Sequence, residues 1–458
     1  MLRVCGVCEW GSVMNKRMRM AAACVAVVVM GLAVAQGQMP APAPVASQRD
    51  QATLAVPRHN NAAPWVASTG RFVAVTWGAA LEGKWDIYVA TSRDEGQTFA
   101  TPVRVNTVDG DGRVGGEIPP RVALHLPKGA TEPQVVVAWN AKDQGTEIKI
   151  ARSRDFGQTF AAPVSLQAPG AAGDRGWHAL TIDAQGLAHV VWLDHRGLAE
   201  APAHAGAKAG SHEAAALDGV AMAMKSRLHY ATYGDRATPE QMLAPGVCYC
   251  CKTALAPTAK GVLATWRHVY DGNMRDMAYV LLGTPGAAAA PPRISADGWS
   301  INGCPDDGPA LAVDAGDRVH AIWPTVIPGD EPVGALFYAS KAASAQTFGA
   351  RQRVTTLGSP KPSHPQVAVD GAGHVFVAWD EIVGGVRTAA WSDGTAGADG
   401  ALRLGAPERL AAAGPTQYPV MAPLARGVVV AWVSGAQGTS VIRVRHLVAA
   451  GAAATAAR

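Results

Sequence analysis

Short apolar runs rich in β-branched residues recur along the chain, and polar turns that contain glycine separate them. Seven of the runs end in a tryptophan, and successive tryptophans are 53 to 74 residues apart. Several runs follow another short strand and a tight turn, as in LTIDAQGLAHVVW and VAVDGAGHVFVAW. This is the pattern of a β-hairpin. The seven residues are Trp77, Trp139, Trp192, Trp266, Trp323, Trp379 and Trp432.

Most hairpins are followed by a third strand, such as DIYVATS, and several of these by a weaker fourth strand, such as PVRVNT. Four antiparallel strands in a repeated unit predict an all-β fold, a β-propeller of four-stranded blades. Seven blades are favoured, and six is the alternative if one copy is degenerate. The last unit lacks a fourth strand, so we expect QATLAV (51–56) to supply it and close the ring. The repeated tryptophans are expected to pack between blades.

Composition and the N-terminus refine this interpretation. The chain is 48% hydrophobic and 17% charged, with 50 glycines and 31 prolines, which suits a folded protein rich in turns. Lys16, Arg17 and Arg19 precede an apolar run that ends at Ala33-Val34-Ala35, the pattern of a cleaved secretory signal. We therefore expect an exported protein, periplasmic or secreted. The predicted divisions are a signal peptide over 1–35, a flexible segment over 36–50, the propeller over 51–447 and a disordered tail over 448–458.

The charge of the chain indicates which classes of partner are poor candidates. The formal net charge is +4 at pH 7, and no run of lysine or arginine follows the leader. Nucleic acid and anionic membranes are therefore poor candidate partners. No later segment is long and apolar enough for a membrane span. We expect a monomer that stays out of the membrane once its signal has been removed.

Two copies of a short motif, S-x-D-x-G-x-T-F, lie between the third and fourth strands of their units, as SRDEGQTF (92–99) and SRDFGQTF (153–160). A worn copy, SKAASAQTF (340–348), keeps the serine, threonine and phenylalanine. The aspartate can accept backbone N–H bonds, the glycine permits the turn, and the aromatic ring can pack between strands. The residues with this structural role are Ser92, Asp94, Gly96, Thr98 and Phe99, and Ser153, Asp155, Gly157, Thr159 and Phe160.

With these Asp boxes the chain resembles the sialidase (BNR/Asp-box repeat) superfamily of β-propellers. The resemblance implies a glycoside hydrolase that acts on a sialylated or other glycan. In that family the boxes lie on the face opposite the active site, an early arginine element binds the sialic-acid carboxylate, and six blades are usual. The nearest early element here, EIPPR (117–121), has a different order.

Polar residues gather in the loops that enter the first strand of each unit and leave the second. In a propeller these loops share one face, so we expect that face to be the functional one. A carboxylate pair would serve acid–base chemistry, and Asp194 and Glu117 are the candidates for catalysis. Arginine forks suit anionic groups, and two tryptophans outside the repeat, Trp177 and Trp299, could stack on a sugar ring. The candidate ligand-binding residues are Arg121, Arg196, Arg267, Trp177 and Asp307. The alternative is that these charges form structural ion pairs.

Four cysteines follow the leader: Cys248, Cys250, Cys251 and Cys304. The first three precede the first strand of the fourth blade and the last precedes that of the fifth, so we expect them to lie side by side. Export favours disulfides, and two would fit, with three possible pairings. The alternative is a thiolate site for Cu(I) or Zn, with help from His178, His195 or His268. The prediction is no cofactor, with copper or zinc at the cysteines as the minority alternative.

Three functions remain open from the sequence. The first is an exo-glycosidase that binds a glycan or another polar ligand. The second is a non-catalytic propeller that binds a glycan or a protein. The third is a periplasmic metal-handling protein that uses the cysteines. The long Ala/Gly-rich stretch 197–224 interrupts the third unit on the polar face, and we expect a lid or a disordered loop there.

Overall fold

The computed structural model describes residues 51–142, 145–168, 173–199, 212–283, 290–329 and 332–449. The predicted signal peptide and the flexible segment that follows it lie outside these residues, as does most of the predicted tail. Ala449 is still buried and belongs to the core. Within the described residues no helix has the length and apolarity that a bilayer span needs.

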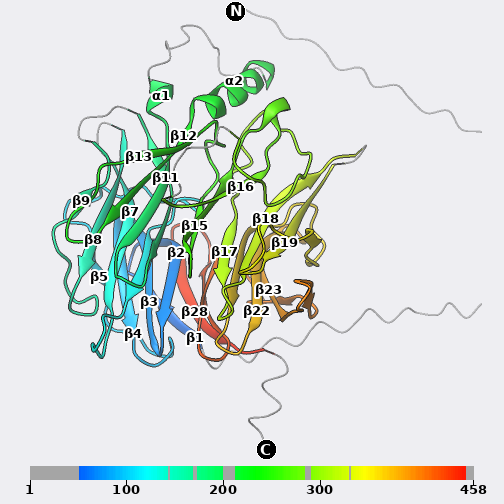
Figure 1. Cartoon of the computed structure of the whole chain (residues 1–458). Helices are drawn as coiled ribbons and strands as arrows, with labels where there is room; N and C mark the ends of the chain where they lie inside the picture. The colour runs from blue at the N-terminus through cyan, green and yellow to red at the C-terminus, as the bar shows by residue number, and fades with distance from the viewer. Residues whose placement is uncertain are drawn as a thin grey trace, which may run out of the picture. The chain divides into compact units, whose positions relative to one another are not determined.

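Seven antiparallel sheets form the blades of a β-propeller (Figure 1), which confirms both the predicted fold and the favoured blade number. The first blade holds β2 (Asn60–Thr69), β3 (Phe72–Leu81), β4 (Lys84–Ser92) and β5 (Val103–Arg104). The second holds β6 (Arg121–His125), β7 (Gln134–Lys142), β8 (Thr146–Ser153) and β9 (Val164–Ser165). The third holds β10 (Arg175–Ile182), β11 (Ala188–Asp194), β12 (Arg227–Tyr233) and β13 (Gln241–Pro245).

The fourth blade is the least regular. Its sheet contains β14 (Ala254–Thr258), β15 (Gly261–Arg267) and β16 (Met277–Leu281). The segment after β16 completes the blade with backbone hydrogen bonds, from Tyr279 N to Pro292 O at 3.1 Å and from Ile294 N to Met277 O at 2.8 Å.

The last three blades follow the same order. The fifth holds β17 (Ala310–Val313), β18 (Val319–Ile327), β19 (Val333–Lys341) and β20 (Gln352–Arg353). The sixth holds β21 (Ser363–Val369), β22 (His374–Val383), β23 (Val386–Ala396), β24 (Leu402–Leu404) and β25 (Glu408–Arg409). The seventh holds β26 (Thr416–Pro423), β27 (Val428–Ser434) and β28 (Val441–Leu447).

The ring closes as the sequence predicted. β1 (Gln51–Leu54) pairs antiparallel with β28, with Leu54 opposite Ile442, and so becomes the fourth strand of the seventh blade. In Figure 1 this joins the blue start of the described chain to its red end. Closure leaves no open sheet edge between the first and last blades.

The core lies between neighbouring blades. All seven repeated tryptophans are at most 2% exposed, which confirms the packing role predicted for them. In the described chain, seven apolar clusters each join two adjacent sheets, as where Trp77 of β3 packs with Val429 and Val444 of the seventh blade. Flat aromatic rings and β-branched residues suit this sheet-on-sheet packing.

The two Asp boxes form self-contained turns on one face, named here the Asp-box face. In the first box, Gly96 N donates to Ser92 Oγ at 2.9 Å and Thr98 N donates to Asp94 Oδ1 at 2.9 Å. In the second box, the bonds from Gly157 N to Ser153 Oγ and from Thr159 N to Asp155 Oδ1 measure 2.8 and 2.9 Å. Both glycines have positive φ, +87° and +88°, a conformation that favours glycine. Phe99 and Phe160 pack against the interblade clusters.

The opposite face, named here the polar face, carries the loops that enter each first strand and leave each second strand. Four first strands begin with a β-bulge, at Ala62/Trp65, Gly176/Ala179, Ser363/Gln366 and Gln417/Val420. Each bulge contains a residue of positive φ: Ala63, Trp177, His364 and Tyr418. Bulges re-aim side chains, and three of these four residues precede a proline, which needs no ladder hydrogen bond there.

We expected a lid or a disordered loop in the insertion of the third blade, and residues 200–211 of that stretch lie outside the described residues. The insertion contains α1 (Arg196–Ala199) and α2 (His212–Lys225), and the helices lie together at one end of the ring in Figure 1. Ala-rich sequence favours a helix where its buried side packs on the protein. In α2 Ala223 is fully buried, and a Cβ at Gly219 would lie 2.9 Å from Gly303 N. The helix therefore covers the loop that carries Cys304.

Candidate active site on the polar face

Six polar residues from five blades meet on the polar face, near the axis of the ring. We name them the axial cluster: Glu117, Lys252, Asp307, His364, Asp380 and Tyr418. Only ring closure brings these residues together, because 301 residues of sequence separate the first from the last.

Lys252 lies at the centre of the cluster. Its ammonium group donates to Glu117 Oε1 and to Gly308 O, both at 3.1 Å, and lies 3.8 Å from Asp307 Oδ1. Its backbone N–H donates to the other Glu117 oxygen at 3.0 Å. The side chains of Lys252, Glu117 and Asp307 are 3%, 4% and 7% exposed. This burial is tolerable because the charges are paired and hydrogen-bonded.

Asp307 and His364 form the second part of the cluster. The backbone N–H of His364 donates to both Asp307 oxygens, at 3.0 and 3.1 Å. Burial raises the pKa of Asp307 to about 6, although the charges of His364 and Lys252 act in the opposite direction. Asp307 therefore changes its charge within the range of pH in which an acid–base catalyst works.

An aspartate orients the imidazole of His364. His364 Nδ1 lies 2.8 Å from Asp380 Oδ1, and Tyr418 N donates to Asp380 Oδ2 at 2.7 Å. Arg387 also donates to Asp380, at 2.5 Å. Burial lowers the pKa of His364, but the Asp380 carboxylate outweighs it, so the pKa is raised overall. Nε2 of His364 makes no hydrogen bond within the described part of the chain.

His364 and Tyr418 form the accessible side of the cluster. The side chain of His364 is 12% exposed and its ring centroid lies 4.4 Å from that of Tyr418. Burial raises the pKa of the Tyr418 hydroxyl to about 12, so it remains a proton donor at neutral pH. A side chain at Gly116 would overlap the Tyr418 ring, and the tyrosine therefore lies against the loop that carries Glu117.

A divalent cation does not fit this cluster well. Glu117, Asp307 and His364 each offer one ligand atom, and the three atoms lie within 4.8 Å of one another. However, the Lys252 ammonium group already neutralises Glu117 and approaches Asp307. A second positive ion there would be repelled, so the chemistry that the cluster supports is proton transfer.

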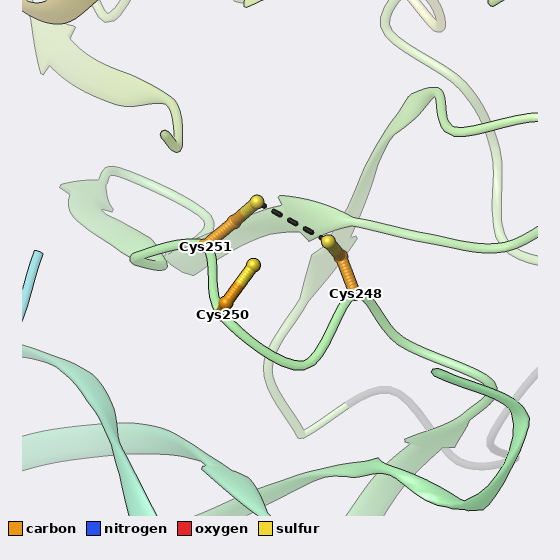
Figure 2. Close-up of side chains that lie close together, drawn as sticks. All are labelled: Cys248, Cys250 and Cys251. Atoms are coloured by element: carbon orange, nitrogen blue, oxygen red, sulfur yellow. Dashed lines mark hydrogen bonds between the residues drawn. The ribbon is translucent and has the colours of Figure 1, made fainter. Parts of the chain in front are cut away.

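The cysteines lie next to the axial cluster. Cys250 and Cys304 form a disulfide between the loops that precede β14 and β17, while Cys248 and Cys251 are free and buried. The structure thus holds one of the two disulfides that we expected. The Cys251 thiol donates to Cys248 Sγ at 3.3 Å (Figure 2). This hydrogen bond and the charges of Arg267 and Arg275 lower the pKa of Cys248 to about 7, and burial raises that of Cys251.

In the described chain, none of the three histidines that we considered as metal ligands, His178, His195 and His268, lies in a possible metal-binding group with the cysteines. The possible ligand groups that include these sulfurs contain cysteines and Asp306 only. His178 bonds Asn140 and Ala138 instead, and burial lowers its pKa to about 3. Burial also lowers the pKa of His195 to about 4.

The two predicted catalytic carboxylates lie in different networks. Glu117 belongs to the axial cluster. Asp194 is fully buried in the third blade, where Arg196 Nε donates to its Oδ1 at 2.8 Å and Arg175 Nε lies 3.4 Å from its Oδ2. Arg196 also pairs with Glu240 at 2.6 Å. The contacts of Asp194 and Arg196 in the described chain therefore make an ion-pair network inside one blade.

Among the other predicted ligand-binding residues, the two arginines are buried and make structural contacts. Arg121 and Arg267 are both 1% exposed. Arg121 stacks on Trp65 at 3.6 Å, and Arg267 lies over Trp299 at 4.8 Å and donates to backbone carbonyls. Trp177 is half-buried and packs against the cysteine loop. Of this set, Asp307 belongs to the axial cluster. Arg267 donates to the backbone oxygen of Asp307 at 3.3 Å, and Trp177 O accepts from Thr253, the residue after Lys252, at 2.8 Å.

Our list of candidate residues omitted Lys252, His364 and Tyr418. A signal was present in the repeats, because His364 and Tyr418 each precede a proline at the start of a first strand, as Ala63 does. Aligning the seven units on this position would have placed both rings at the same end of neighbouring blades. The pairing of His364 with Asp380 has no comparable signal.

A cavity of about 800 Å³ lies on the side of the Asp-box face, away from the polar face. Its lining includes the first strands and strand 1–2 turns of several blades, among them Leu255, Leu311, Val367 and Met421. The walls are mainly apolar, and Asp183, Asp314 and Asp317 lie at the turns. The cavity contains no member of the axial cluster.

Comparison with known proteins gives similarity of structure without similarity of sequence. No family model and no curated protein matches the chain. An α-L-arabinanase from Penicillium chrysogenum, solved with arabinobiose, is 14% identical with a TM-score of 0.45, over 86% of this chain and 94% of the other. The polysaccharide lyase Uly1 is 10% identical with a TM-score of 0.49, over 86% and 91%.

A leech intramolecular trans-sialidase is also similar, at 9% identity and a TM-score of 0.45, over 82% of this chain and 83% of the other. The propeller fold that the resemblance implied is confirmed by the seven sheets of this chain. At these identities and TM-scores, the chemistry of this chain has to be argued from its own residues.

Proposed function

We propose that this propeller binds a glycan over its polar face and hydrolyses a glycosidic bond by general acid–base catalysis at the axial cluster. The observation that carries the proposal is the unit formed by Asp380, His364 and Asp307. A carboxylate orients the imidazole, and a second carboxyl group with a raised pKa lies against the backbone of the same histidine. Paired groups with shifted pKa values are typical of acid–base sites.

The directions of the pKa shifts support one role for each of the two groups. The pKa of His364 is raised, so its imidazolium form can donate the Nε2 proton to the leaving glycosidic oxygen near neutral pH. Above about pH 6 Asp307 is ionised and can accept a proton from water. The water oxygen then bonds to the anomeric carbon as the glycosidic bond breaks. Asp307 takes one proton from the water, and His364 gives one proton to the leaving oxygen. Tyr418 and Trp177 offer aromatic faces on which a sugar ring can stack.

The test is turnover of fluorogenic glycosides, with a sialoside and an arabinofuranoside among them. His364→Gln and Asp307→Asn should each lower kcat by about 10²–10⁴-fold, the usual contribution of one acid–base group. His374→Gln is the matched control, because His374 also pairs with an aspartate, Asp370 at 3.4 Å, but at the opposite end of the same blade. Activity of the wild-type chain should rise through about pH 6 and fall again above the raised pKa of His364.

A second candidate is a propeller that binds a glycan or a protein without cleaving it. The burial of Glu117 and Asp307, and the use of their oxygens in internal hydrogen bonds, favour it. Binding on a glycan array without turnover of any glycoside would support this candidate and overturn the hydrolase. Loss of that binding in a Tyr418→Ala variant would place the binding surface at the axial cluster.

A further inference from the structure

Cys248 and Cys251 form a thiol pair that the axial cluster does not use. They stand in a Cys-x-x-Cys spacing in the loop between β13 and β14, and are 1% and 2% exposed. Their sulfur atoms lie 3.3 Å apart and point toward each other (Figure 2). Cys250, between them in sequence, is bonded to Cys304. The disulfide therefore leaves two sulfurs together in a site closed to solvent.

Two buried guanidinium groups lie next to this pair. Arg267 and Arg275 are 1% and 0% exposed, and both charges act on Cys248. Cys248 N donates to Arg267 O at 2.9 Å. Nη1 and Nη2 of Arg275 have no hydrogen-bond partner in the described residues, and neither arginine has a carboxylate within 4.0 Å there.

The two positive charges favour an anionic state of the two sulfurs over a neutral one. A buried positive charge is costly unless an anion compensates it. A disulfide between Cys248 and Cys251 is neutral and would supply no anion to either guanidinium group. A metal bound by two thiolates keeps a negative charge when the metal is monovalent, and thiolates select soft ions such as Cu(I). Structural zinc takes four ligands, and the disulfide has withdrawn two of the four cysteines.

We propose that Cys248 and Cys251 bind one Cu(I) ion as a two-coordinate bis-thiolate, whose single negative charge lies beside the positive charges of Arg267 and Arg275. Two thiols and Cu(I) give the bis-thiolate complex and two protons, with no change of oxidation state. The site needs neither the glycan nor the axial cluster, so it stands or falls independently of the proposed hydrolase.

The test is an anaerobic titration of the purified full chain with Cu(I) against bicinchoninate, with X-ray absorption at the copper edge. We expect one Cu(I) per chain and a first shell of two sulfurs. Cys248→Ser/Cys251→Ser should lose this binding, and Cys250→Ser/Cys304→Ser should retain it. Arg275→Gln should weaken it by about tenfold, within the range typical of groups that support a ligand.

Three results would overturn the proposal without depending on the folding of any variant. The first is a purified wild-type chain without free thiols, in which peptide mass mapping shows Cys248 linked to Cys251. The second is a wild-type chain with two free thiols that takes no Cu(I) from bicinchoninate. The third is a wild-type chain that binds Zn(II) in preference to Cu(I).

Discussion

At the scale of the residue, the Asp boxes show how one carboxylate holds a turn. Asp94 accepts hydrogen bonds from Ser92 Oγ at 2.6 Å and from the backbone and side chain of Thr98 at 2.9 and 2.5 Å. Burial raises the pKa of Asp94, but these hydrogen bonds outweigh it and lower the pKa to about 2. The worn third box has no aspartate, yet Phe348 still packs between the fourth and fifth blades. The aromatic ring therefore has a packing role that does not need the carboxylate.

Asp94→Asn should lower the free energy of unfolding by about 1–3 kcal/mol, the usual contribution of hydrogen bonds to a charged group. Because the folded pKa lies below the usual value of about 3.9, the contribution is complete above pH 4 and disappears as the pH falls through about 2. Urea unfolding at several pH values measures it. Asp109→Asn is the control, since that side chain is 82% exposed. Equal stability of the two variants at pH 7 would contradict the prediction.

At the scale of the element, the short strand β1 closes the ring by pairing with β28. β1 contributes four residues to the seventh blade, and Leu54 is 5% exposed in the cluster that joins the first and seventh blades. A strand pairing so distant in sequence has to offset the entropy lost when the two ends of the chain are brought together. The pairing persists because it buries the apolar edge of β28.

Leu54→Ala should destabilise the chain by about 2–5 kcal/mol, as other core truncations of leucine do. Thr53→Ala in the same strand is the control. Thr53 is exposed and loses only a surface hydrogen bond from Arg443, so it should change stability by less than about 1 kcal/mol. Urea unfolding followed by tryptophan fluorescence reports the difference. If both variants unfold at the same urea concentration, β1 does not close the ring in solution.

At the scale of the whole molecule, the disulfide joins two blades at the face where the axial cluster lies. Cys250 and Cys304 are 54 residues apart in sequence. The loops that they join also position Lys252 and Asp307, whose charged groups are 3.8 Å apart. The disulfide therefore restricts the unfolded chain and also holds together two loops of the proposed active site.

Cys250→Ser/Cys304→Ser should lower the free energy of unfolding by about 2–5 kcal/mol, because the unfolded chain gains freedom when the loop is opened. Thermal unfolding with and without a reductant checks this. The reductant should lower the Tm of the wild-type chain and leave that of the variant unchanged. A reductant-sensitive variant would show that another disulfide stabilises the fold.

The sequence by itself determined the repeated unit and the way the ring closes. Period-2 strands, turn glycines and a tryptophan at a fixed place in each unit are local signals, and they gave seven blades and the closing role of 51–56 correctly. They also placed the cysteines on adjacent loops. For the Ala/Gly-rich insertion the sequence analysis did not predict α2, which packs on the Cys304 loop.

The tertiary structure decided which polar residues act together. Glu117, Asp194 and Arg196 look alike as charged residues in loops of the polar face, but only Glu117 reaches the axis, while the other two pair with each other. His364 is a candidate catalytic residue only in the folded chain, where it lies in the β-bulge of β21 and its Nδ1 contacts Asp380. The physical reason is that the strand pattern depends on neighbours in sequence, whereas ion pairs and pKa shifts depend on distances that exist only after blades from both ends of the chain have met.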